Sequence, residues 1–201
     1  MPVTLEELAK PRSFEQEKLA QNPLELILDK ELERLGTVHK PSYIADRSLG
    51  IDRILKSPDG VLTTFQYKVE WAANRTGNMF IETEQRLVRD CDKEVTKVWP
   101  GWYKVILAQM LLCLVPQNMT LHVCNVPKLK ALAKVISSRY SLKQCRAGSK
   151  ESYSPEHTLF GIGFAVPFDD LMELGAITRI IKLERDGISS KYLESDSSCR
   201  P

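Results

Sequence analysis

Apolar residues recur every three or four positions near the start of the chain, as on one face of an amphipathic helix. They are Leu24, Ile27, Leu28, Leu32 and Leu35, and Gly36 follows them directly. Glycine commonly ends a helix because it adopts the left-handed conformation without a steric penalty. The pattern predicts a helix from about residue 14 to residue 35, interrupted or restarted at Pro23, after a shorter helix at residues 4–10.

Beyond this helix the pattern changes to runs rich in β-branched and aromatic residues, which are typical of strands. Residues 50–55 and 61–71 form two such runs, and the turn sequence Ser-Pro-Asp-Gly at 57–60 lies between them. A third run covers residues 78–84. The sequence therefore predicts an antiparallel meander of three strands, with residues 72–77 as its second connection.

The C-terminal half alternates between helical and strand patterns. Helices are expected at residues 102–109, 127–140 and 167–174, and strands at 111–115, 119–124, 161–166 and 177–183. This order indicates an α/β protein with a mixed β-sheet core flanked by helices. We expect an N-terminal extension at residues 1–13, one domain at 14–185, and a disordered serine-rich tail at 186–201.

Composition fits a globular domain that needs no covalent staples. Of the 201 residues, 43% are hydrophobic and 27% are charged, with a net charge of +2. The five cysteines include no CxxC pair, which favours reduced thiols in the cytoplasm. The chain starts without a signal-peptide pattern, and its longest apolar run, at 105–116, is too short for a transmembrane segment.

Candidate chemistry lies on the second predicted strand, where Gln66, Lys68 and Glu70 share one face because side chains alternate along a strand. An ordinary half-exposed strand shows the same alternation. Asp52 changes the picture, because a hairpin across the 57–60 turn brings it next to Gln66 and Lys68. A carboxylate, an amide oxygen and an ammonium group would then lie together, as metal-dependent phosphodiester hydrolysis requires.

These residues carry a family resemblance. Asp52, thirteen intervening residues and then Gln66-Tyr67-Lys68 resemble the PD-(D/E)xK nuclease signature in its (D/E/Q)xK form. The stretch GIDRILKSPDGVLTTFQYKVEWAANRTGNMFIETE is similar to phage and bacterial members of this superfamily. The flanking stretches GWYKVILAQ, NVPKLKALAKV and GFAVPFDDL also resemble them, and the resemblance covers roughly residues 14–183.

The resemblance implies a restriction-endonuclease-like fold and roles for particular residues. Asp52 would be the main metal ligand, Gln66 would take the place of the usual Glu or Asp, and Lys68 would be the catalytic lysine. Glu70, a further candidate catalytic residue, and Glu82 match positions that are often acidic. A glutamate of the first long helix often completes such sites, and Glu31 is the candidate here, with Glu17 and Glu25 as rivals. The implied cofactor is Mg²⁺ or Mn²⁺.

The stretch from residue 126 to 150 contains no acidic residue. Its basic side chains could neutralise DNA phosphates, or they could belong to a solvated helix face followed by a flexible loop. They are Lys128, Lys130, Lys134, Arg139, Lys143, Arg146 and Lys150. Arg75 could add a phosphate contact, and Asn78 lies in a Thr-Gly-Asn loop that could approach nucleic acid or simply form a tight turn.

Together these features predict a Mg²⁺-dependent deoxyribonuclease in the cytoplasm of a bacterial or phage-infected cell, with double-stranded or branched DNA as its substrate. Dimerisation is common among such nucleases, so a homodimer is also expected. One alternative is a catalytically silent DNA-binding member of the same fold, which Gln66 favours because an amide is a weaker ligand than a carboxylate. Another is a structural or assembly protein of a phage or viral-type element.

Overall fold

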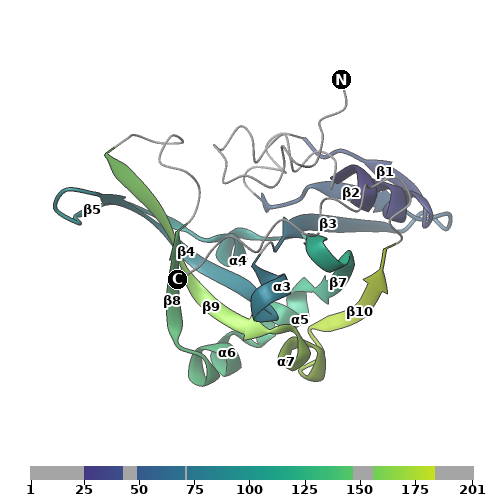
Figure 1. Ribbon diagram of the computed structural model, residues 1–201. Helices are drawn as coiled ribbons and strands as arrows, with labels where there is room; N and C mark the ends of the chain where they lie inside the picture. Colours follow the sequence, from purple (N-terminus) through teal and green to yellow (C-terminus); the bar gives the residue numbers. More distant parts are fainter. Residues whose placement is uncertain (1–24, 43–48, 71, 147–155, 184–201) are drawn as a thin grey trace.

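The computed structural model describes residues 25–42, 49–70, 72–146 and 156–183 (Figure 1). Residues 25–33 are helical and a turn follows at 34–35, so the expected helix ends close to Gly36. The expected short helix at 4–10, the start of the long helix, the extension at 1–13 and the tail at 186–201 lie outside the described residues. The expected mixed α/β class is confirmed, because the described chain combines helices with two β-sheets.

The larger sheet, sheet A, has six strands in the order β1-β2-β3-β6-β7-β10. Neighbouring strands are antiparallel except β3 and β6, which run parallel. Sheet A is therefore mixed, as the sequence predicts. Its strands are β1 (Thr37–His39), β2 (Arg53–Lys56), β3 (Leu62–Val69), β6 (Met110–Val115), β7 (Thr120–Asn125) and β10 (Ile177–Lys182).

The smaller sheet, sheet B, is antiparallel with the order β5-β4-β9-β8. Its strands are β4 (Asn78–Arg89), β5 (Val95–Pro100), β8 (Leu142–Arg146) and β9 (His157–Pro167). The predicted three-strand meander is wrong, because β4 belongs to this sheet and the free edge of β3 is taken by β6. The one-turn helix α3 (Ala73–Thr76) and Gly77, at φ +66°, redirect the chain between the sheets.

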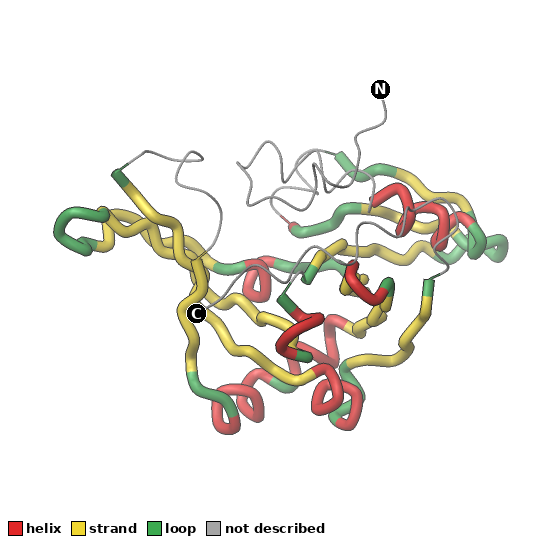
Figure 2. The backbone as a smooth tube through the Cα atoms, viewed as in Figure 1, coloured by secondary structure: helices red, strands yellow, loops and turns green. Residues whose placement is uncertain are grey.

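Short helices connect and cover the sheets (Figures 1 and 2). They are α4 (Trp102–Val105), α5 (Val126–Ala131), α6 (Ala133–Arg139) and α7 (Phe168–Glu173), with a 3₁₀ turn at Pro116–Asn118. The single helix expected at 127–140 is two helices, which meet at Leu132. Asn125 caps α5 by accepting a hydrogen bond from the Lys128 backbone N–H at 2.9 Å.

The strands β1, β5 and β8 are missing from the sequence prediction. Most of their residues are exposed, and all five residues of β8 are. An exposed edge strand shows no strong apolar alternation, so its pairing depends on the neighbouring strand rather than on its own sequence. The segment that could have been a flexible basic loop is thus, over Leu142–Arg146, the edge strand of sheet B.

Two apolar clusters lie on opposite faces of sheet A, because residues alternate along β6. Leu112 and Leu114 pack with Leu28 and Leu32 of the 25–33 helix. Leu111 and Cys113 instead pack toward sheet B and the short helices, in a cluster that includes Met79, Ile81, Leu129, Ile136 and Leu171. The register Gln66↔Leu111 and Lys68↔Cys113 places the candidate site on this second face of sheet A.

Candidate active site

The β2–β3 hairpin sets the register of the candidate site. Arg53 lies opposite Phe65 and Lys56 opposite Leu62, and the Asp52 backbone N–H donates to the Phe65 carbonyl at 2.8 Å. Asp52 therefore lies beside Gln66, on the face that Lys68 shares. The turn at 57–60 fixes this register, with Gly60 at φ +86° and its N–H donating to the Ser57 carbonyl at 2.9 Å.

The Asp52 carboxylate is held by the backbone of the neighbouring strand. Its Oδ2 accepts a hydrogen bond from the Tyr67 backbone N–H at 2.5 Å. Asp52 itself is half-buried, directly before the first residue of β2. A carboxylate anchored through one oxygen in this way keeps its position relative to Gln66, and this matters for a group that would coordinate a metal ion.

Gln66 presents a buried oxygen to the same place. Its Oε1 is buried and accepts no hydrogen bond within the part of the chain that the structure describes. A Cβ atom on Gly50 would lie 2.9 Å from this oxygen, and Gly50 has φ +58°, so the position requires glycine on both counts. A buried oxygen without a donor is costly unless another ligand satisfies it.

Lys68 and Glu70 form an ion pair at the end of β3. The Lys68 Nζ lies 3.1 Å from Glu70 Oε1 and 5.1 Å from the centre of the Trp102 ring, which favours a cation above its face. The same Glu70 oxygen accepts the Phe80 backbone N–H at 3.0 Å, so Glu70, which is only 7% exposed, also ties β3 to β4.

Glu82 is the second buried carboxylate near Lys68. Its Oε1 accepts a hydrogen bond from Gln85 Nε2 at 2.8 Å. Burial raises the pKa of Glu82, the hydrogen bond from Gln85 and the charge of Lys68 oppose this, and Glu70 adds to the rise. Gly161 leaves room for this carboxylate, because a Cβ atom there would lie 2.5 Å from Glu82 Oε2.

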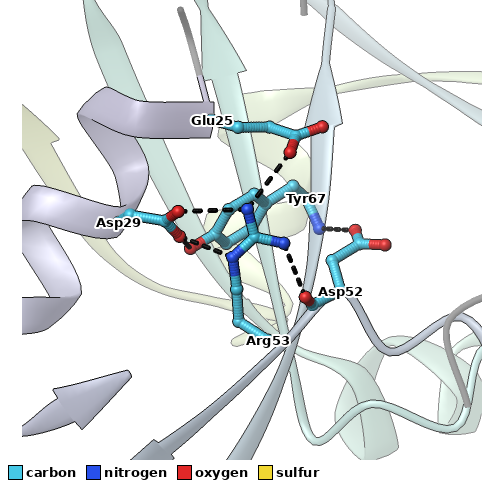
Figure 3. Close-up of polar contacts among 5 residues, drawn as sticks. All are labelled: Glu25, Asp29, Asp52, Arg53 and Tyr67. Carbon is cyan, nitrogen blue, oxygen red and sulfur yellow. Dashed lines mark hydrogen bonds and ion pairs between the residues drawn. The ribbon is translucent and has the colours of Figure 1, made fainter. Parts of the chain in front are cut away.

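Behind the hairpin, a buried network connects Asp52 to the 25–33 helix (Figure 3). Arg53 donates from Nε and Nη2 to the two oxygens of Asp29, at 2.7 and 3.0 Å, and from Nη2 to Glu25 at 3.2 Å. Its Nη1 donates to the Asp52 carbonyl at 2.7 Å, and the Tyr67 hydroxyl donates to Asp29 at 2.7 Å. Arg53 thus holds the Asp52 carbonyl, and the Tyr67 backbone N–H holds the Asp52 carboxylate.

Sequence reasoning missed this network. Its signal was present in two places, since Glu25 and Asp29 stand four residues apart on one helical face and Arg53 interrupts an apolar strand. Burial raises the pKa of the Tyr67 hydroxyl, and its hydrogen bond to Asp29 raises it further. Tyr67 therefore stays protonated and acts as a donor.

The helix glutamates do not join Asp52 and Gln66. Glu31 pairs with Arg34 at 3.0 Å, on a helix that packs against the opposite face of sheet A. Glu25 binds Arg53 on that same side, and Glu17 lies outside the described residues. The expected set of Asp52, Gln66 and Glu31 is therefore not assembled by the described chain, because the 25–33 helix lies across sheet A from Gln66.

The basic stretch is divided among several elements. Lys130 donates from Nζ to the Ile106 carbonyl at 2.5 Å, while Lys128, Lys134 and Arg139 are exposed on α5 and α6. Lys143 and Arg146 are exposed on β8, and Lys150 lies outside the described residues. Arg75 is exposed in α3, and Asn78 is half-buried at the start of β4.

Among the described residues, no three His, Cys, Asp or Glu side chains converge in a way that could hold a metal ion. A metal bound at this place would rely on Asp52 together with the amide oxygen of Gln66, and its remaining ligands would be water or substrate. In the same ranges, no helix is long and apolar enough to cross a membrane.

No protein family and no curated protein matches this chain in sequence. Among solved structures, the chain is similar to a bacterial homing endonuclease, I-Ssp6803I. The similarity has a TM-score of 0.32 and 22% sequence identity, and it covers 53% of this chain and 63% of that chain. The chain thus matches less than two thirds of the length of that endonuclease.

Proposed function

We propose that this chain is a metal-dependent DNA nuclease of the restriction-endonuclease-like type, which hydrolyses phosphodiester bonds. The observation that supports this most strongly is the hairpin register, which brings Asp52, Gln66 and Lys68 together on one face of sheet A. The sequence places these three residue types at the spacing of the nuclease signature. Because cutting a duplex takes two cuts, the proposal includes a homodimer.

The donor set fits a hard divalent cation. Asp52 supplies a carboxylate and Gln66 a buried amide oxygen without a donor among the described residues. Oxygen ligands of this kind suit Mg²⁺ and Mn²⁺. A bound ion would polarise a phosphoryl oxygen and lower the pKa of a coordinated water.

Lys68 would orient the attacking water and stabilise the negative charge that develops on the phosphate. Glu70 acts as a positioning residue, because it holds the Lys68 ammonium at 3.1 Å and is itself fixed by the Phe80 backbone N–H. The face of the Trp102 ring also contacts the Lys68 ammonium. Lys68 is thus held in one place before any substrate binds.

Plasmid and linear duplex DNA test the proposal directly. We expect wild-type protein to cut both substrates with Mg²⁺ or Mn²⁺ and to leave them intact in EDTA. The double variant Asp52→Asn/Lys68→Ala should be inactive with either metal. Absence of metal-dependent cutting by the wild type would contradict the proposal, and it would favour DNA binding without catalysis, the alternative that the neutral Gln66 side chain supports.

Replacement of Gln66 by glutamate should strengthen metal binding. A carboxylate carries a full charge where the amide carries a dipole, so the Mg²⁺ concentration that gives half-maximal cleavage should fall by about tenfold. Cleavage rates measured over a range of Mg²⁺ concentrations check this. The matched control is Gln117→Glu, at the 3₁₀ turn after β6, which should leave the Mg²⁺ dependence unchanged.

A further inference from the structure

One side of sheet B, which we name the Glu82 face, carries two exposed lysines. Directly opposed residues on neighbouring strands point to the same side. Glu82 lies opposite Gly163, and Gly163 lies opposite Lys143 of β8. Gln85, which binds Glu82, shares this side, so Leu87 and the opposing Lys97 of β5 share it too.

An aromatic ring supports the lysine of β5. Trp99 lies opposite Gln85, on the Glu82 face, and the Lys97 Nζ lies 4.9 Å from the centre of its ring. Such a contact holds an ammonium group in position without neutralising its charge. Lys97 and Lys143 are both exposed, and neither belongs to an ion pair within the described part of the chain.

The Glu82 face is continuous with the candidate active site. Glu70, which pairs with Lys68, accepts the Phe80 backbone N–H at 3.0 Å, and the side chains of Phe80 and Glu82 both border Gly161 on this side of sheet B. On β8, Cys145 lies between Lys143 and Arg146 and opposite Gly161. Burial raises the pKa of the Cys145 thiol, and the carboxylates of Glu70 and Glu82 contribute. The edge strand β8 and the candidate active site of sheet A are therefore neighbours on the Glu82 face.

The helix α6 lies on the other side of sheet B from the Glu82 face. Met79 and Ile81 alternate with Glu82 along β4, and they pack in one cluster with Leu129 of α5 and Ile136 of α6. Figure 1 shows α6 beside β9 and away from α4, whereas α5 contacts α4, because the Tyr103 hydroxyl donates to the Leu129 carbonyl at 3.1 Å. The exposed side chains Lys134 and Arg139 of α6 therefore lie on the side of sheet B opposite the Glu82 face.

We propose that duplex DNA lies across the Glu82 face, with Lys97 and Lys143 binding its phosphates on either side of Lys68, and that α6 takes no part. β5 and β8 are the two edges of sheet B, three strand spacings or at least roughly 14 Å apart. A duplex can reach both edges at once, since its major groove alone is about 12 Å wide. This inference rests on the proposed function, because the scissile phosphate must reach Lys68.

The test compares two double variants that remove the same charge from the two sides of sheet B. Fluorescence anisotropy of a labelled 20-base-pair duplex is measured in EDTA, where no cleavage interferes. Lys97→Ala/Lys143→Ala should weaken binding about tenfold and reduce the slope of log affinity against log salt by about 1.8, as expected for two lost phosphate contacts. Lys134→Ala/Arg139→Ala should change the affinity less than about twofold.

Circular dichroism confirms that each variant is folded, which is expected because all four side chains are exposed. A larger loss of affinity in the α6 variant, or equal losses in both, would overturn the inference. Cleavage of the same duplex in Mg²⁺ separates the two proposals. If the wild type cuts DNA but the Lys97→Ala/Lys143→Ala variant binds it normally, only the proposed DNA path is wrong. If the wild type neither binds nor cuts DNA, both the DNA path and the proposed nuclease function are wrong.

Discussion

Lys68→Ala is expected to lower the rate of DNA cleavage by about a thousandfold. Among Asp52, Gln66 and Lys68, it is the Lys68 ammonium that carries a positive charge and can stabilise developing negative charge on the phosphate. Its loss removes a contact to the phosphate that is strongest in the transition state, where the negative charge is greatest. The substitution also leaves the buried Glu70 carboxylate without its cation, although the Phe80 backbone N–H still donates to it, so we expect a loss of about 3 kcal/mol of stability and circular dichroism must show that the variant is folded.

Single-turnover cleavage rates at saturating Mg²⁺ measure this effect. Lys56→Ala is a matched control, because Lys56 is an exposed lysine of the same hairpin and ends β2 away from the site. It should cut DNA at nearly the wild-type rate. If Lys68→Ala cuts at that rate too, Lys68 has no role in the chemistry and the hairpin is an ordinary half-exposed pair of strands.

Arg53→Met is expected to reduce the free energy of unfolding by about 3–5 kcal/mol. The substitution preserves the apolar stem but leaves Asp29 and Glu25 without the cation that binds them, in a place where Arg53 is only 7% exposed. Breaking one side of a buried ion pair costs far more than the pair contributes, because the remaining charge is poorly solvated. The Asp52 carbonyl also loses its donor.

Urea unfolding followed by circular dichroism measures this loss. Arg34→Met is the matched control, since it breaks the exposed pair with Glu31 on the same helix and should cost less than about 1 kcal/mol. The double variant Arg53→Met/Asp29→Leu should recover part of the lost stability, because the main uncompensated charge is gone. Equal losses for Arg53→Met and Arg34→Met would show that the Arg53 network contributes no more to stability than an exposed ion pair does.

Local patterns predicted the parts of the fold that depend on neighbours in sequence. The Ser-Pro-Asp-Gly turn and the alternation on both sides of it led to the correct hairpin, with Asp52 beside Gln66. Turn geometry and a two-residue period determine such a register over a few residues. The strands β6, β7, β9 and β10 and the helix α7 were predictable for the same reason.

Partners distant in the chain depended on tertiary packing. The sequence carries no local signal for the parallel pairing of β3 with β6, and this pairing moved β4 into a second sheet. Glu31 was the expected helix ligand for a metal, with Glu25 as a rival, but Glu31 pairs with Arg34, and Glu25 binds Arg53 together with Asp29. A buried guanidinium must be paired with carboxylates, because an unpaired charge in the protein interior is costly.

The sequence by itself determined which residues form the candidate chemistry: Asp52, Gln66 and Lys68 follow from the turn and the strand period alone. Only the tertiary structure decided what surrounds them. It divided one basic stretch between two sides of sheet B, and it placed Lys97 on the side that carries Glu82. The physical reason is that side-chain alternation fixes a face only relative to the strand itself, whereas packing decides which face meets the site.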